Sequence, residues 1–229
     1  MLTFEKAEFS QDAFLLNADV TIAAGKVTAV IGPSGAGKST LLHGVAGFVP
    51  QTGGRLLWDG AVIQDQSPDK RPVSMLFQDN NLFPHLTVLQ NVALALSPQL
   101  RPSPEVVEKV EEMLTRVGLS GLSGRKPSGL SGGQQSRVAL ARALLQDRPV
   151  MLMDEPFSAL GPALKDEMLD LSVALAAGRT VVMVTHDPND AVRIADEVVG
   201  VADGKAWMPM ETSAFMAQPP EPMRDYFNR

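Results

Sequence analysis

The residues best suited to chemistry form a glycine-rich segment that directly follows the strand-like run Val27–Ile31. The segment fits the pattern G-x-x-x-x-G-K-S, in which Lys38 reaches the β- and γ-phosphates of a nucleotide and the Ser39 hydroxyl binds Mg²⁺. Glycines let backbone N–H groups curl around phosphate oxygens, and the helix expected next directs its positive N-terminal end at them. The predicted nucleotide contacts are Gly32, Pro33, Ser34, Gly35, Ala36, Gly37, Lys38, Ser39 and Thr40.

Two adjacent carboxylates, Asp154 and Glu155, supply the second part of such a site. They follow Val150–Met153, a run of four apolar residues that suits a central strand buried on both faces. Asp154 is expected to act on Mg²⁺ through its coordination shell. Glu155 is expected to polarise the attacking water, either as a general base or as an orienting group. Together with the phosphate loop, the pair predicts hydrolysis of ATP or GTP rather than two ordinary loop carboxylates.

A second helix start with the features of an anion site lies at Leu130–Gln134, with the sequence Leu-Ser-Gly-Gly-Gln. Ser131 and the two glycines open a helical pattern that runs to Leu145. An enzyme with one phosphate loop rarely needs two such sites. A plain serine-capped helix would explain Ser-Gly-Gly by itself. It does not explain this pentapeptide at a position about twenty residues before the acidic pair of a phosphate-loop site.

This pentapeptide resembles the signature motif of the ABC (ATP-binding-cassette) ATPases, and other segments agree along the chain from about Leu2 to Lys205. Gln78, after a strand, is similar to the family's Q-loop glutamine. Ser158–Leu160 is similar to its D-loop, and His186 to its switch histidine. A histidine at the end of an apolar strand can reach a γ-phosphate and sense its presence.

The resemblance implies a head-to-tail dimer with two composite ATP sites. Ser131, Gly133 and Gln134 of one copy are expected to close over ATP held by the phosphate loop of the other. It also implies roles within the site. The catalytic residues are then Glu155, His186 and Gln78, the magnesium contacts are Ser39, Gln78 and Asp154, and the cofactors are ATP and Mg²⁺.

Two positions depart from the family pattern or are not fixed by it. The D-loop normally continues with Asp, but here Gly161 follows Leu160, which removes the side chain that contacts the partner copy. The family also stacks adenine on an aromatic residue roughly twenty residues before the phosphate loop. Phe9 is the predicted residue, with Gln11 and Phe14 as alternatives.

The elements that position these residues alternate between strands and helices, which indicates an α/β layered fold. Strand-like runs end in turn or loop signals at Lys26–Ile31, Arg55–Trp58, Val73–Phe77, Val150–Met153, Thr180–Val184 and Glu197–Ala202. Pro104–Val117 is a predicted helix, with Ser103 as N-cap and Gly118 just past its end. The resemblance implies a P-loop NTPase core of the ABC type, with an antiparallel β subdomain and an inserted helical subdomain. Residues 1–229 are predicted to form one domain, with the helical lobe at about 80–135.

Composition places the chain among ordinary globular proteins, with 45% hydrophobic and 20% charged residues. The net charge of -6 without a long basic run argues against nucleic acid as the main partner. No cysteine is present, so disulfides and cysteine metal sites are excluded. No apolar run approaches the roughly 20 residues that span a bilayer, and the first ten residues lack a secretory pattern. A cytosolic chain with separate membrane partners is therefore expected.

The run Arg71–Phe83, which surrounds Gln78, is similar to the ATPases of bacterial thiamine importers. This resemblance implies an ATP-hydrolysing importer subunit at the cytoplasmic face of the bacterial inner membrane. Its partners are then a second copy, two transmembrane permease subunits and, indirectly, a periplasmic solute-binding protein. The segment Asn80–Leu96 is expected to receive the permease. The expected contact residues are Phe83, Pro84, Leu86 and Val88.

Other functions stay open from the residues alone. The first alternative is an ABC importer ATPase for another small solute, such as a polyamine, iron or an oxyanion. A non-transport ABC ATPase that acts on DNA or ribosomes is disfavoured, because the stretch between Lys38 and Gly129 is too short for a long coiled-coil insertion. A stand-alone GTPase or kinase is disfavoured by Leu130–Gln134.

Overall fold

The computed structural model describes residues 1–227 as an α/β fold built on a single eleven-stranded sheet. The strands are β1 (Leu2–Gln11), β2 (Phe14–Ile22), β3 (Val27–Ile31), β4 (Gln51–Trp58), β5 (Ala61–Val62), β6 (Val73–Leu76), β7 (Val150–Asp154), β8 (Thr180–Val184), β9 (Glu197–Ala202), β10 (Lys205–Ala206) and β11 (Met210–Glu211). The helices are α1 (Lys38–Ala46), α2 (Val88–Ala93), α3 (Pro104–Arg116), α4 (Gly132–Leu145), α5 (Pro162–Leu175), α6 (Pro188–Ile194), α7 (Thr212–Ala217) and α8 (Glu221–Phe227), with a 3₁₀ turn at Pro127–Gly129.

One half of the sheet is parallel, in the order β6-β7-β8-β3-β9. Every residue of β3, β7 and β8 is buried, which is why these strands are apolar without alternation. The carboxyl ends of parallel strands meet at one edge of the sheet. Four segments with predicted site residues start from that edge. The phosphate loop follows β3 and the acidic pair lies at the end of β7, while His186 follows β8 and Gln78 follows β6.

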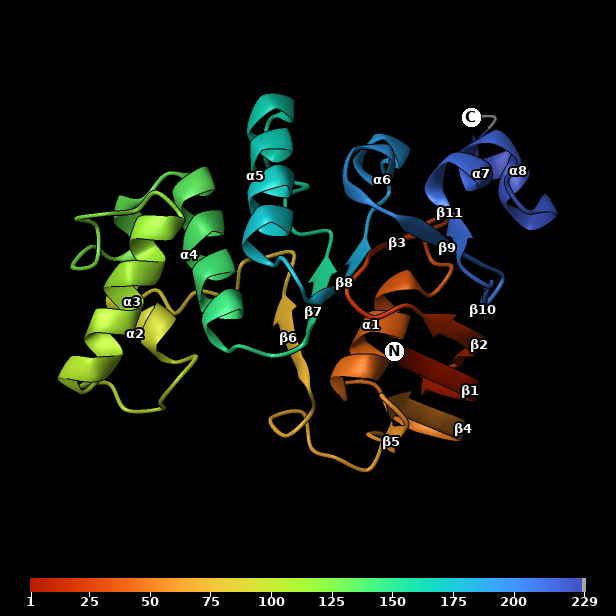
Figure 1. The fold of residues 1–229 in the computed structure, drawn as a ribbon, viewed down its shortest axis with the longest axis horizontal. Coiled ribbons are helices and arrows are strands. Elements are labelled where there is room, and N and C mark those ends of the chain that lie inside the picture. Colours follow the sequence, from red (N-terminus) through yellow and green to blue (C-terminus); the bar gives the residue numbers. More distant parts are fainter. Residues whose placement is uncertain (228–229) are drawn as a thin grey trace.

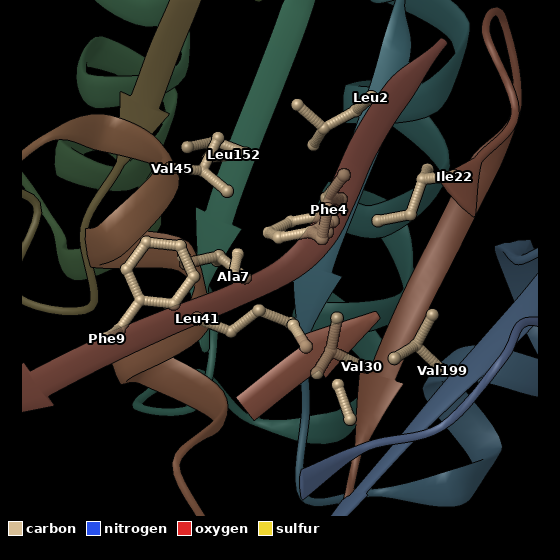
Figure 2. Packing of buried hydrophobic residues seen from close by; sticks show 14 of the residues in the cluster. Leu2, Phe4, Ala7, Phe9, Ile22, Val30, Leu41, Val45, Leu152 and Val199 are labelled. Carbon is tan, nitrogen blue, oxygen red and sulfur yellow. The ribbon is translucent and has the colours of Figure 1, made fainter. Parts of the chain in front are cut away.

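The other half is antiparallel, in the order β5-β4-β1-β2, and the short strand β10 joins it to β9. Helix α1 lies between β1 and the parallel strands. Figure 2 shows the core there, where Phe4 and Phe9 of β1 meet Leu41 and Val45 of α1 and Leu152 of β7. This buried contact fixes the start of α1, and with it the phosphate loop, against both sheet halves.

Between β6 and β7 the described chain is helical, and α2, α3 and α4 lie at the end of the molecule opposite β1, β2 and β4 (Figure 1). A second core cluster joins these helices to the parallel sheet, and it includes Val110 and Leu114 of α3, Leu140 of α4 and Met151 of β7. The Ser103 hydroxyl caps α3 by accepting from the backbone N–H of Val106. No described helix is both long and apolar enough to cross a bilayer.

Most predicted element bounds agree with the structure, and the differences have local causes. Thr180–Val184 and Glu197–Ala202 match β8 and β9. The strand predicted at Arg55–Trp58 starts earlier in the structure, at Gln51. The prediction missed its first residues because Gly53 and Gly54 interrupt the apolar pattern on which it was based. Helices α7 and α8 of the C-terminal segment were not predicted. The predicted single domain 1–229 also includes Asn228 and Arg229, which lie outside the described residues.

Candidate nucleotide site

The phosphate loop forms the turn from β3 into α1. Gly37, the N-cap of α1, has a φ of 105°, a conformation that L side chains rarely adopt, and no side chain caps the helix there. The first N–H groups of α1 are therefore left for an anion. The Lys38 ammonium donates to the carbonyl oxygens of Gly32 (2.8 Å) and Pro33 (2.9 Å). Burial lowers the pKa of Lys38, and the carboxylates of Glu155 and Asp154 partly offset this effect.

A cavity of about 720 Å³ lies beside this loop, large enough for a nucleotide. Its walls come from the turn between β1 and β2, the phosphate loop and the loop after β7. The lining residues are Gln11, Asp12, Ala13, Phe14, Ser34, Gly35, Gly37, Lys38, Ser39, Thr40 and Glu155. The half-buried Phe14 ring lies so close to Gly37 that a Cβ added there would be 2.8 Å from it. Phe14 is therefore an aromatic surface inside the cavity.

The predicted role of Phe9 in adenine stacking is wrong. Phe9 is fully buried, packs edge-on to Phe4, and closely approaches Gly44 of α1. Figure 2 shows it within the core between β1 and α1. The sequence does not distinguish the two phenylalanines, because both lie in the expected window. The antiparallel pairing of β1 with β2 distinguishes the two rings, since it buries Phe9 and places Phe14 at the turn beside the phosphate loop.

The donors for a magnesium ion lie together at the ends of α1 and β7. The Ser39 hydroxyl donates to Oδ1 of Asp154 over 2.9 Å, and Asp154 is the last residue of its strand. A hydroxyl and a carboxylate are the hard oxygen ligands that Mg²⁺ prefers, so these residues fit the ion. The imidazole of His43 also reaches Asp154, with its Nε2 atom 3.2 Å from Oδ2. His43 matches no position of the family pattern, so the motifs predict no role for it.

Glu155 and His186 lie in contact at the ends of β7 and β8. Nδ1 of His186 is 2.9 Å from the Glu155 carboxylate. Glu155 has a φ of 42°, in the left-handed region that non-glycine residues rarely occupy. Its N–H donates to the carbonyl oxygen of Val184 on β8, which helps to hold this strained backbone. Strain of this kind occurs at functional sites, where it sets the direction of a side chain.

A partly buried ion-pair network supports the backbone on the C-terminal side of His186. Lys165 of α5 lies 2.6 Å from both Asp187 and Asp190, and Thr185 donates to Asp190 over 2.6 Å. Burial lowers the pKa of Lys165, but the hydrogen bonds to Asp187 and Asp190 outweigh it and raise the pKa overall. His186 therefore lies between two residues that the network holds. Lys165 has no signature in the sequence, because only the fold brings α5 to α6.

Gln78 is exposed just beyond β6, the strand next to β7, and it is absent from the lining of the nucleotide cavity. The segment after it is tied to α4. The guanidinium of Arg142 donates to the carbonyl oxygens of Asn80 and Asn81 over 2.8 Å each, and Asn80 donates to Ser136 of the same helix. The loop that carries Gln78 is thus attached to the helix that the Ser-Gly-Gly segment begins.

Ser131, Gly133 and Gln134 form the start of α4. The Ser131 hydroxyl accepts from the Gln134 N–H (3.3 Å), and the Gln134 side chain accepts from the Ser131 N–H (3.0 Å), which makes a capping box. Gly133 leaves room for α5, because a Cβ there would lie 2.6 Å from Leu164. None of the three residues lines the nucleotide cavity of the same chain.

Gly161 is the N-cap of α5 and has ordinary extended angles, φ −66° and ψ 155°. No side chain caps the helix, and a Cβ at this position meets nothing within 4 Å. An aspartate fits this backbone without strain and is a favoured N-cap residue. The glycine is therefore not required by the conformation of the D-loop segment.

We expect Gly161→Asp to raise the thermal midpoint by about 1 °C, because an Asp cap exceeds a Gly cap by a few tenths of a kcal/mol. ATP hydrolysis by the isolated subunit should stay the same or rise. Gly161→Ala is the matched control, since it restricts the backbone equally but adds no cap. Calorimetry and a phosphate-release assay measure both effects. A clear drop in hydrolysis with Asp but not with Ala would contradict this account.

Comparisons with known proteins agree with this geometry. Residues 15–158, more than half of the chain, match the family described as ABC transporter. The chain is 52% identical over 228 residues to a "Thiamine import ATP-binding protein ThiQ" of a Ruegeria species, covering 99% of each protein. It is 54% identical over 228 residues to the protein of the same name from Cereibacter sphaeroides, again covering 99% of each.

A solved structure with the same fold is a dimeric post-hydrolysis state of an ATP-binding cassette bound to ADP and Pi. It superposes with a TM-score of 0.78 at 30% sequence identity, and the match covers 93% of this chain and 99% of that one.

Proposed function

The chain belongs to the ABC transporter family, and from that membership we propose that it is the ATP-hydrolysing subunit of a thiamine importer, acting as a dimer on separate permease subunits. The observation that carries the proposal is the identity of about half of all residues, over the full length, to proteins named for thiamine import. The nucleotide cavity and the groups around it supply the chemistry.

We assign ATP to the cavity beside the phosphate loop. The triphosphate lies against the N-terminus of α1, where the exposed N–H groups and Lys38 offset its charge. Lys38 then exchanges its bonds to the two loop carbonyls for phosphate oxygens. Phe14, in place of Phe9, offers its ring to the adenine. Ser39 and Asp154 would hold the magnesium ion, and Gln78 would be its third protein contact. When bound, Mg²⁺ neutralises charge on the phosphates.

Glu155 and His186 complete the catalytic end of the site. Glu155 takes the water proton or orients the water for attack, and its direction is set by the bond to His186 and by its constrained backbone. His186 contacts the γ-phosphate, and its backbone is held through Asp187 by Lys165. A γ-phosphate therefore acts on the Glu155–His186 contact, which couples nucleotide state to the geometry of the catalytic base.

We propose that Ser131, Gly133 and Gln134 act on ATP bound by a second copy. These residues lie outside the cavity of their own chain, and the capping box pre-forms the helix start that faces a phosphate. A related cassette is dimeric with ADP and Pi bound. One closed dimer then contains two ATP sites, each built from both copies.

The permease subunits are proposed to dock at a groove of about 510 Å³ next to the Gln78 loop. Phe83 lines this groove and is exposed, and its neighbour Pro84 is exposed as well, as expected for contacts. Leu86 and Val88 are buried, so their predicted role as surface contacts is wrong, and they pack the region instead. Arg142 lines the groove and holds the Gln78 loop, so a docked segment acts directly on that loop. Docking places the chain at the cytoplasmic face of the inner membrane, opposite a periplasmic solute-binding protein.

We expect deletion of this gene to abolish high-affinity uptake of labelled thiamine by cells that cannot make thiamine and have no second importer. A plasmid copy of the gene should restore uptake, and a copy with Glu155→Gln should not. Uptake of spermidine, ferric iron and phosphate serves as the control, because these represent the other solute classes considered above. Unimpaired thiamine uptake at nanomolar concentration would overturn the solute assignment. Loss of one of the control solutes instead would assign the chain to that importer.

A further inference from the structure

Helix α1 contacts both oxygens of the Asp154 carboxylate. Ser39 and His43 are four residues apart, so they project from the same face of the helix, one turn from each other. The Ser39 hydroxyl bonds to Oδ1 over 2.9 Å, and Nε2 of His43 lies 3.2 Å from Oδ2. A carboxylate that one rigid element bonds at one oxygen and contacts at the other cannot rotate freely about its Cβ–Cγ bond.

The imidazole of His43 also contacts an aromatic ring. The ring of Phe48 packs edge-on to it, with the ring centroids 6.3 Å apart and the planes at 83°. The His43 side chain is 31% exposed and the Asp154 side chain 11%, so the contact lies at the edge of the site, partly shielded from water. Partial burial of this kind strengthens the electrostatic interaction between an imidazole and a charged oxygen.

We propose that His43 is a positioning residue for the magnesium site: its imidazole Nε2, in contact with Oδ2, keeps the Asp154 carboxylate directed toward the position of the ion. The inference rests on the proposed role of Asp154 as a magnesium contact. If the Ser39 hydroxyl held the ion, it would hold Asp154 less firmly, and the contact with His43 would still orient the carboxylate. Groups that orient a metal ligand in this way contribute about 10- to 100-fold in metal affinity.

A purely structural role for His43 is the competing explanation. His43 lies in the last turn of α1, where a partial positive charge stabilises a helix end. That role changes folding stability and leaves metal affinity unaffected. The two roles therefore differ in which measurement responds to a substitution.

The test compares His43→Ala and His43→Gln with the parent chain, in complex with the slowly hydrolysed analogue AMP-PNP. Glutamine places its amide donor near the position of Nε2, so it is the conservative variant. The Mn²⁺ affinity of each complex is measured by electron paramagnetic resonance. The affinity for AMP-PNP with EDTA present, and the thermal midpoint of each protein, are measured in parallel. Asp154→Asn is included in the same series.

We expect His43→Ala to weaken Mn²⁺ binding by about 10- to 100-fold, and His43→Gln to recover most of the loss. Metal-free analogue binding should change less than about twofold, because the phosphate loop is intact. If His43→Ala binds Mn²⁺ as tightly as the parent chain while Asp154→Asn binds it much more weakly, the proposed role of His43 is overturned and that of Asp154 stands. Equal losses in His43→Ala and His43→Gln, with lowered midpoints, overturn it in favour of the structural role. No loss in Asp154→Asn overturns the metal role of Asp154, and the inference with it.

Discussion

We expect the variant Glu155→Gln to lose ATP hydrolysis by a factor of about 10² to 10⁴ while it retains ATP binding. An amide keeps the size of the carboxylate and can still bond to His186, whose Nδ1 lies 2.9 Å away. It cannot accept a proton from water. The change also removes one negative charge from beside the triphosphate, so bound ATP should be held at least as tightly as in the parent chain.

The same variant should accumulate as an ATP-bound dimer, because closure is no longer followed by hydrolysis. Gel filtration with and without ATP measures this as a doubling of the apparent mass. Glu108→Gln is the matched control, since it makes the same chemical change on the exposed face of α3, far from the site in the fold. Adding Ser131→Arg to Glu155→Gln should prevent the dimer, because it places a bulky side chain where the second copy meets the nucleotide. A monomer in ATP at all concentrations would contradict the composite site.

The sequence predicts those parts of the site whose residues are adjacent along the chain. The phosphate loop works through backbone N–H groups that must follow one another, and the acidic pair must end a buried strand. Both constraints leave a continuous pattern, at Gly32–Ser39 and at Val150–Glu155. The structure puts the two patterns in contact through Ser39 and Asp154, because β3 and β7 are parallel strands of one sheet. The α/β class follows from the same strands.

Contacts between distant segments were beyond sequence reasoning. Lys165 reaches Asp187 and Asp190 only because α5 packs beside α6, and Arg142 reaches the Gln78 loop across sixty residues of chain. Both are tertiary contacts with no local signature. The buried position of Phe9 is of the same kind, since it depends on how β1 pairs and on which face α1 covers.

His43 is a different case, because a local signal did exist. A residue four positions after Ser39 in a helix lies on the same face, so any side chain there with a hydrogen-bond donor is directed toward the partner of Ser39. Helical spacing applied to the metal ligand, rather than comparison with a family pattern, identifies His43. Residues that support a functional group are found by this kind of geometric extension where no motif includes them.

The second large effect is expected for Lys38→Ala, which should reduce both ATP affinity and hydrolysis. Removing one partner of a buried, hydrogen-bonded charge pair costs about 2–5 kcal/mol, or roughly 30- to 4,000-fold in affinity. Lys38 is buried, and the structure shows its ammonium group bonded to Gly32 and Pro33 at the mouth of the loop. These bonds hold the cation at the proposed position of the β- and γ-phosphates, and no second cation lines the cavity among the described residues.

Two further variants separate the charge of Lys38 from its structural bonds. Lys38→Met keeps the length and apolar stem of the side chain but has no charge, and Lys38→Arg keeps the charge in a planar group that does not fit a point-charge site. If the charge matters most, Met should be as defective as Ala, and Arg should retain more ATP affinity than either. If the bonds to the loop carbonyls matter most, Lys38→Ala and Lys38→Met should both have lower thermal midpoints without nucleotide, in addition to lower ATP affinity. Calorimetric titration with ATP in EDTA measures affinity without hydrolysis. Near-normal ATP affinity and hydrolysis in Lys38→Met would remove Lys38 from the site, because the proposed binding mode leaves its charge directly against the triphosphate.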